Sequence, residues 1–425
     1  MKKQLWMIFG PIFCAIVAIG ILFLSPFFTR TQNDTVWKEA SSSMAANVLR
    51  GNSIKNAAIG SGEYIPFFGS SELSRIDSFH PSALAKAYDR GYTPFLLGAP
   101  GTQSLTQFMM IQSMKDELKG KPVVFIISPQ WFVRDGMKDD YFNAYFSELQ
   151  AYEWALSLTN VTPSDRYVAT RLLSYAKVQK NQAFMNSLAQ IEQGKLPSGF
   201  SRTRLALETR ILSREDQLFS RFGLLSKQKK IDQAAQKLPK TYDYHELEKL
   251  ATKQGQKSTS NNTFEIDNQF YQQRVKKNLK RLKGSQKGYN YLSSPEYGDF
   301  QLVLNQLAEI QAKPLFIIPP VNEKWQAYTG LSPKMLNGFS KKINYQLKEQ
   351  GFEHVVDFTQ EARIPYFMAD TIHLGWRGWL ESDRYIEPFL TNPQQEATYH
   401  LSDEFYSNDW QKLKPERLPD PTKKQ

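Results

Sequence analysis

The chain of 425 residues is predicted to be an α/β protein whose parallel five-stranded sheet carries helices on both faces. Three observations predict this class. Short apolar runs recur along the chain, and segments with helical periodicity separate them. The runs at 122–127 and 314–318 are continuously apolar, which is typical of strands buried on both faces. A long polar, helical block interrupts the alternation between the third and fourth runs.

Each element is predicted from its own pattern. Apolar runs predict strands at residues 64–68, 93–97, 122–127, 314–318 and 354–357. Helical periodicity predicts helices between and after them, at residues 81–90, 102–118, 300–312 and 332–350. Gly91, Gly120 and Gly351 stand where three of these helices should end. Because the carboxyl ends of parallel strands share one edge of a sheet, the loops after the strands are expected to converge on one site.

The N-terminal segment is predicted to be a membrane anchor. Residues 5–28 contain no charged side chain, and at about 1.5 Å per residue they can cross the roughly 30 Å hydrocarbon layer. Lys2 and Lys3 precede them and predict a cytoplasmic N-terminus, with the rest of the chain outside the cytoplasm. A cleaved signal peptide is the alternative, although bulky residues stand where small cleavage-site residues are expected.

The chain is therefore divided into four parts. They are a cytoplasmic head with a transmembrane helix over 1–30, a polar and partly helical connector over 31–60, a catalytic domain over 61–395, and a C-terminal tail over 396–425 that is expected to be frayed from Asp409. The helical block at about 138–295 is an insertion in the catalytic domain, and it has no convincing buried strand.

Charge and cysteine content narrow the possible functions. The net charge is +11, and 50 basic and 42 acidic residues follow residue 30, an excess that points toward a polyanionic partner or an anionic membrane surface. A solvated basic face is the alternative. Cys14 is the only cysteine, so the part after residue 30 has no disulfide and no thiol nucleophile. No two of the five histidines have metal-ligand spacing, so no metal site is predicted.

Two segments about 300 residues apart carry the expected chemistry. Ser70 follows the first predicted strand, where its N–H and the start of a helix favour a developing oxyanion. Asp370 and His373 are three residues apart and open the last predicted helical segment. A serine nucleophile, a histidine base and an orienting carboxylate form a catalytic triad. Helix capping by Ser70 and Asp370, with His373 on the surface, is the alternative.

The motifs resemble those of the SGNH (GDSL-like) hydrolases and acyltransferases, which have a three-layer α/β/α fold. Gly69-Ser70-Ser71 matches the serine motif, the loop ending at Gly101 matches the glycine motif, and Asp370-Thr-Ile-His373 matches the last motif. Ser128-Pro-Gln130-Trp131 stands where that group has Gly-x-Asn-Asp, so Gln130 is expected to replace the Asn donor. The resemblance implies an oxyanion hole formed by Ser70, Gly101 and Gln130.

The whole chain resembles the DltD family of D-alanyl transfer proteins more closely. The matching segments include Phe-Phe-Gly-Ser-Ser-Glu-Leu-Ser-Arg, Gly-Thr-Gln-Ser-Leu, Ser-Pro-Gln-Trp-Phe and Asp-x-Ile-His-Leu-Gly-Trp-x-Gly-Trp. This resemblance implies a membrane-tethered extracellular enzyme that helps to attach D-alanine to lipoteichoic acid. It also implies three partners, a membrane-bound O-acyltransferase, a small membrane peptide and a D-alanyl carrier protein. Ester-to-ester transfer needs no cofactor.

Further residues are expected near the substrate. Trp131 and Trp376 lie beside motif residues and are expected to wall the site, although core packing is the commoner role of tryptophan. Lys276 and Lys280, in a basic helical stretch, are expected to contact the polyanionic acceptor, with a solvated helix face as the alternative. Three other functions stay open: a non-catalytic scaffold, an esterase or thioesterase that removes D-alanine, and a polysaccharide O-acetyltransferase.

Overall fold

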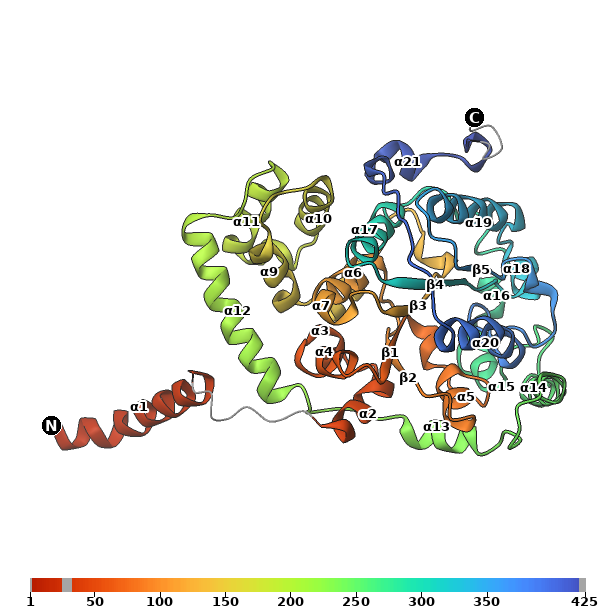
Figure 1. Cartoon of the computed structure of the whole chain (residues 1–425), viewed down its shortest axis with the longest axis horizontal. Coiled ribbons are helices and arrows are strands. Elements are labelled where there is room, and N and C mark those ends of the chain that lie inside the picture. The colour runs from red at the N-terminus through yellow and green to blue at the C-terminus, as the bar shows by residue number, and fades with distance from the viewer. Residues whose placement is uncertain (1, 25–32, 420–425) are drawn as a thin grey trace.

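The core of the molecule is one parallel sheet of five strands. The computed structural model describes residues 2–24 and 33–419 (Figure 1). The strands lie in the order β2-β1-β3-β4-β5 and all neighbours are parallel. Their bounds are β1 (Tyr64–Phe68), β2 (Thr93–Leu97), β3 (Pro122–Ile126), β4 (Lys313–Ile318) and β5 (Val355–Asp357). The predicted sheet is therefore confirmed, with strand ends that differ by one residue at most.

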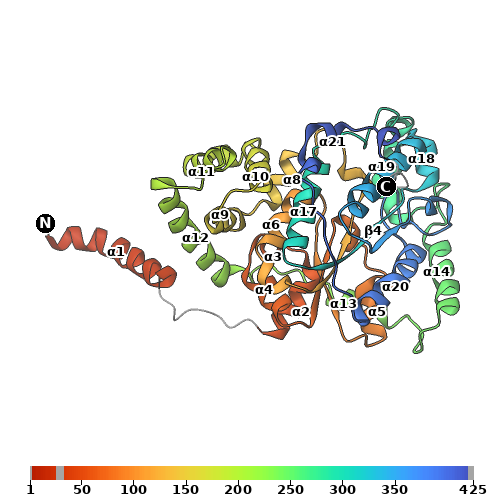
Figure 2. The same ribbon diagram turned by 45° about the horizontal axis from the view of Figure 1, so that its top comes forward.

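Helices cover both faces of this sheet. The chain passes from β1 to β2 in one direction and from β2 through β3 and β4 to β5 in the other, so right-handed connections place their helices on opposite faces. In Figures 1 and 2, α17 and α20 lie on opposite sides of β4. The helices concerned are α5 (Pro81–Ala87), α6 (Ser104–Gln112), α17 (Glu296–Glu309), α19 (Pro333–Lys348) and α20 (Trp376–Thr391). The predicted helix over 102–118 is broken at Ser113 and Met114, where α7 (Lys115–Leu118) begins.

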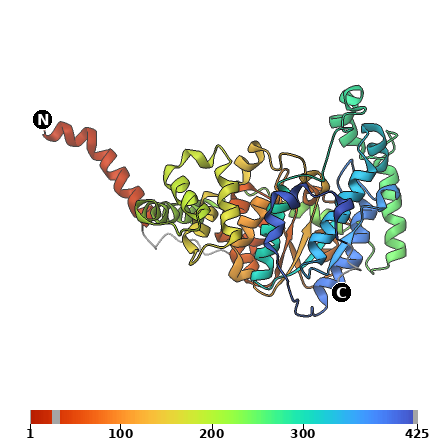
Figure 3. The same ribbon diagram turned by 90° about the horizontal axis from the view of Figure 1, so that it is seen from above.

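The long insertion passes around the sheet instead of forming one compact unit. Its helices α9 to α12 lie on one side of the molecule, α13 crosses below the sheet, and α14 to α16 lie on the opposite side (Figures 1 and 3). Their bounds are α8 (Asp139–Tyr145), α9 (Glu148–Ser157), α10 (Pro163–Leu173), α11 (Gln182–Glu192), α12 (Gly199–Phe219), α13 (Gln228–Ala235), α14 (Tyr244–Ser258), α15 (Asn268–Phe270) and α16 (Leu279–Leu282).

The N-terminal part contains the expected connector and most of the expected anchor. The connector, predicted to be polar and partly helical, forms α2 (Asp34–Ser43), α3 (Ala46–Arg50) and α4 (Ser53–Gly60), and these helices also bury apolar side chains in the main core. Before it, α1 (Lys2–Leu24) contains most of the predicted anchor, and residues 25–28 of that anchor lie outside the described residues. No helix in the described ranges combines the length and hydropathy needed to span a bilayer.

The C-terminal tail is ordered beyond the point where fraying was predicted. α21 (Asn408–Lys412) buries Trp410, whose ring lies edge-on to Phe405 at a centroid distance of 4.7 Å. The Nζ of Lys342 on α19 donates hydrogen bonds to the carbonyls of Leu292 and Gln411 and lies 3.9 Å from the ring centre of Tyr297. The prediction from charge and proline content was therefore wrong for residues 409–412, because apolar anchors outweigh the local polarity.

Candidate active site

The serine whose side chain contacts His373 is Ser71, not Ser70. β1 ends at Phe68, and η2 (Ser71–Ser74), a short 3₁₀ helix, follows at once. Ser71 Oγ lies 2.7 Å from His373 Nε2. Ser70 is the N-cap of η2, and its Oγ accepts the N–H of Ser71 at 2.6 Å. The tight turn sends the two neighbouring side chains in different directions, so Ser71 and not the predicted Ser70 contacts His373 in this structure.

Asp370 and His373 form the pair that the sequence predicts. Both oxygens of Asp370 lie within hydrogen-bond distance of His373 Nδ1, at 2.8 and 2.7 Å. An ionised carboxylate has no proton to give, so Nδ1 carries the proton and Nε2 is free to accept one from Ser71. The pair does not open a helix as expected, because it lies in a loop before α20 that the bridge between Met368 and Leu374 closes.

Arg75 is a second side chain that binds Asp370, and the sequence did not reveal this contact. Its guanidinium lies 2.8 Å from Asp370 Oδ2 and 5.3 Å from the ring centre of Phe270 in α15. Burial acts to raise the pKa of Asp370, but the charges and hydrogen bonds of His373 and Arg75 outweigh it and lower that pKa. Asp370 is therefore held as a carboxylate. The only sequence signal is that Arg75 belongs to the segment that follows the serine motif.

Glu72 places a buried carboxyl group beside the triad. Its Oε1 accepts the N–H of Ser70 at 2.6 Å, while its Oε2 is buried without a hydrogen-bond partner in the described part of the chain. Burial raises the pKa of Glu72, against the lowering effects of backbone hydrogen bonds and of His373. The N–H of Ser70, which was expected to donate to an oxyanion, donates to Glu72 in this structure.

The loop after β2 packs directly against the serine turn. Thr102 Oγ1 and Gln107 Nε2 both donate to the carbonyl of Gly69, each at 2.8 Å. Gly101 has a φ of +94°, and a Cβ there would lie 2.1 Å from the ring of Tyr141. A glycine is therefore required at this place by both backbone and space.

Gln130 and Trp131 lie in η3 (Pro129–Trp131), directly after β3. Gln130 is half-buried at the same sheet edge as the serine turn, and its side chain makes no hydrogen bond within residues 2–24 and 33–419.

Trp131 is buried and lies edge-on to Phe125 in the core, and Trp376 is also buried. Both tryptophans therefore fit the core alternative. Lys276 and Lys280 are exposed on separate short helical turns.

The described residues hold no cluster of three or more side chains suited to bind a metal ion.

The arrangement of Ser71, His373 and Asp370 suits nucleophilic acyl transfer. His373 is 5% exposed, whereas Ser71 is half-buried, so a substrate reaches the site from the side of Ser71. Segments from the insertion border this loop, since the N–H of Asp267 donates to the carbonyl of Ala369 at 2.7 Å.

Comparison with known proteins gives a consistent result. The sequence model of the family described as "DltD protein" matches residues 41–391. The chain is 45% identical over 412 residues to Protein DltD of Lacticaseibacillus rhamnosus, which covers 96% of this chain and 97% of that protein. It is 35% identical over 393 residues to Protein DltD of Bacillus subtilis (strain 168), and these cover 92% of this chain and 98% of that protein. It is 27% identical over 390 residues to Protein DltD of Staphylococcus aureus (strain NCTC 8325 / PS 47), which cover 90% and 95%.

Proposed function

The chain belongs to the DltD family, and on this premise we propose that it is an SGNH-type serine acyltransferase that transfers D-alanine to lipoteichoic acid. The observation that carries the proposal is the 2.7 Å contact between Ser71 Oγ and His373 Nε2, with Asp370 behind the histidine. This geometry supplies a nucleophile, its base and the group that orients the base. The parallel sheet supports an SGNH-like fold, because the motif loops follow β1, β2 and β3.

The first half-reaction forms a covalent intermediate. His373 Nε2 takes the proton of Ser71 Oγ while that oxygen bonds to the carbonyl carbon of an activated D-alanyl ester or thioester. The bond from this carbon to the donor's oxygen or sulfur then breaks, and the leaving group takes the proton from His373. A D-alanyl-Ser71 ester results. Two donors are proposed for the oxyanion, the N–H of Gly101 and the amide of Gln130, each contributing about 2.7–4 kcal/mol.

The second half-reaction regenerates the serine. A glycerol hydroxyl of lipoteichoic acid gives its proton to His373 while its oxygen bonds to the carbonyl carbon. The bond to Ser71 Oγ then breaks, and that oxygen recovers the proton. One ester replaces another, so the step needs no cofactor. Lys276 and Lys280 are exposed cations that suit the phosphates of this acceptor.

The proposed place of action is the outer face of the cell membrane. Residues 5–28 carry no charge, and we propose that they attach the chain to the membrane with its N-terminus in the cytoplasm. Proposed partners are the membrane-bound O-acyltransferase and the small membrane peptide of the pathway, with the D-alanyl carrier protein as the earlier source of the acyl group. This arrangement would bring donor and acceptor to the same surface.

The test compares two neighbouring serines in cells whose only copy of the protein is the variant. Ser71→Ala should abolish D-alanine esters on lipoteichoic acid, whereas Ser70→Ala should retain a substantial part of them, at matched membrane levels. Peptide mass spectrometry of trapped wild-type protein should locate a D-alanyl group on Ser71. Esters near the wild-type level in Ser71→Ala cells would refute the covalent mechanism and favour a scaffold. A rise in esters in cells that lack the protein would favour an esterase.

A further inference from the structure

One side of α12 exposes a row of large apolar side chains. Phe200, Leu207 and Ile211 are 79%, 57% and 45% exposed, and their spacing of seven and four residues places them on one side of the helix. Phe222 and Leu225, just beyond the helix, are 63% and 75% exposed. These five residues are called the α12 face. Large apolar side chains that gather on one exposed side of a helix suit an interaction site.

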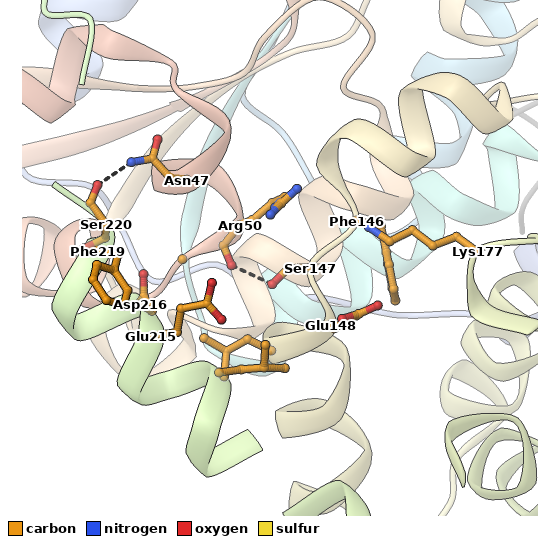
Figure 4. A pocket seen from close by; sticks show the side chains of 13 residues that line it. Asn47, Arg50, Phe146, Ser147, Glu148, Lys177, Glu215, Asp216, Phe219 and Ser220 are labelled. Atoms are coloured by element: carbon orange, nitrogen blue, oxygen red, sulfur yellow. Dashed lines mark hydrogen bonds between the residues drawn. The ribbon is translucent and has the colours of Figure 1, made fainter. Parts of the chain in front are cut away.

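The opposite side of α12 is fixed to the body of the molecule. Asp216 Oδ2 accepts the N–H groups of Asn52 and Ser53 at the start of α4, at 2.8 and 2.7 Å. Asn47 Nδ2 donates to the carbonyl of Phe222 at 2.9 Å and also to that of Ser220. Figure 4 shows Asn47, Asp216 and Ser220 at a pocket of about 170 Å³ between α12 and the body. The α12 face therefore points outward because its helix is held from behind.

The α12 face is continuous with the apolar N-terminal helix. The ring of Phe23 in α1 lies 6.4 Å from the ring of Phe219, and Phe219 lies 6.1 Å from Phe222. In Figures 1 and 3, α12 forms the side of the body nearest to α1, and Figure 1 shows α12 running across the direction of α1. A helix that enters a membrane along its axis would thus leave α12 lying along the membrane plane.

The charges around the α12 face suit an anionic lipid surface. Residues 195–230 contain nine Lys or Arg and three Asp or Glu residues, a net charge of +6. Arg202, Arg204 and Arg210 are exposed on α12 itself. An interfacial helix combines these features: large apolar side chains that enter the headgroup region, and basic side chains that reach the phosphates. An apolar groove on a partner protein would match the apolar side chains of the α12 face, but it would not account for the excess of basic residues around them.

We propose that the α12 face is a second membrane contact, which inserts its apolar side chains into the headgroup region of an anionic bilayer. With α1 it would hold the body of the protein in one orientation on the lipid surface. Ser71 would then be kept at a fixed height above the membrane. The proposal goes beyond the acyltransferase function and does not depend on the chemistry of Ser71.

The test measures how deeply α12 enters a bilayer. The full chain with Cys14→Ser provides a background without cysteine, in which Leu207→Cys carries an environment-sensitive fluorophore. Lys253→Cys is the matched control, because Lys253 is exposed on α14 at the far side of the molecule (Figure 1). Both proteins are reconstituted in vesicles of phosphatidylcholine and phosphatidylglycerol, at a ratio of about 3:1, which gives the bilayer an anionic surface. The vesicles also contain a lipid with a nitroxide near its headgroup, which quenches a nearby fluorophore.

The expected result is that the probe at position 207 is quenched at least about threefold more than the probe at 253, because an interfacial helix lies about 5–10 Å into the headgroup boundary. Vesicles of phosphatidylcholine alone should reduce the quenching at 207. Equal quenching at 207 and 253 in the anionic vesicles would overturn the proposal. The proposal would also be overturned if the emission of the probe at 207 showed an apolar environment in native membranes but the nitroxide lipid did not quench it. A protein partner would then cover the α12 face. The same labelled protein with Ser71→Ala should be quenched as before, which separates this proposal from the acyltransferase function.

Discussion

At the scale of single residues, Arg75 ties the Asp370 carboxylate to the insertion. Its guanidinium binds Asp370 at 2.8 Å and lies against Phe270, and its side chain is 35% exposed. It touches neither Ser71 nor the reacting atoms, so it acts as a positioning residue for the Asp370–His373 pair. Loss of its positive charge should raise the pKa of Asp370 and loosen the orientation of His373.

We therefore expect Arg75→Gln to slow the labelling of Ser71 by a fluorophosphonate about tenfold, which corresponds to about 1.4 kcal/mol. Arg75→Lys should recover part of the rate. The acidic limb of the pH–rate profile should also move to higher pH in Arg75→Gln, which a loss of packing alone would not cause. Arg363→Gln is the matched control, because Arg363 forms an exposed ion pair with Glu323. An unchanged profile in Arg75→Gln would contradict a positioning role.

The sequence brought Asp370 and His373 together with the Gly-Ser-Ser turn, but which of the two serines contacts His373 could not be read from it. The choice between Ser70 and Ser71 depends on the backbone angles of Ser70, φ −138° and ψ −124°, which direct its side chain back to the N–H of Ser71. Glu72 and Arg75 carry no motif of their own, and their roles follow from contacts with Ser70 and Asp370 that exist only after folding.

At the scale of elements, the strands were predictable because each is a short, almost wholly apolar run. The packing of α2 to α4 into the core was not predictable, because their segment mixes polar residues with the few apolar ones that reach the core. The course of the insertion around the sheet was hidden as well. Helical periodicity gives the elements of the insertion, but long-range contacts such as that of Asp267 with Ala369 decide where they lie.

The loop after β2 gives a testable case of steric fit between elements. Gly101→Ala should lower the free energy of unfolding by about 1–3 kcal/mol, because a φ of +94° strains an alanine and its Cβ would overlap the ring of Tyr141 on α8. Chemical denaturation measures the loss. Tyr141→Ala in the same chain should recover the steric part and leave the backbone part. Full recovery by Tyr141→Ala would show that the positive φ costs nothing, contrary to this account.

At the scale of the whole molecule, a buried lysine joins the N-terminal helices to the rest of the core. Lys55 Nζ lies within hydrogen-bond distance of side-chain oxygens of Asn52, Asn56 and Ser113, at 2.9, 3.0 and 2.8 Å. Burial lowers the pKa of Lys55 to about 7, and the charges of Asp216, Glu153 and Glu117 oppose this only in part. The pKa of a lysine in the unfolded chain is about 10.4. Between pH 7 and this value, the unfolded chain therefore binds more protons at Lys55 than the folded protein does.

Stability should accordingly depend on pH in a way that a neutral side chain removes. The contribution of Lys55 is fully present above the unfolded-state pKa and declines as pH falls toward about 7. The free energy of unfolding of the wild type minus that of Lys55→Met should therefore rise by about 1.4 kcal/mol per pH unit from about pH 7 to 10. Urea unfolding in detergent at several pH values measures this slope. Lys253→Met, at an exposed site, is the matched control. A flat difference for Lys55→Met would mean that the folded protein keeps this lysine charged, with its three oxygen partners compensating the burial.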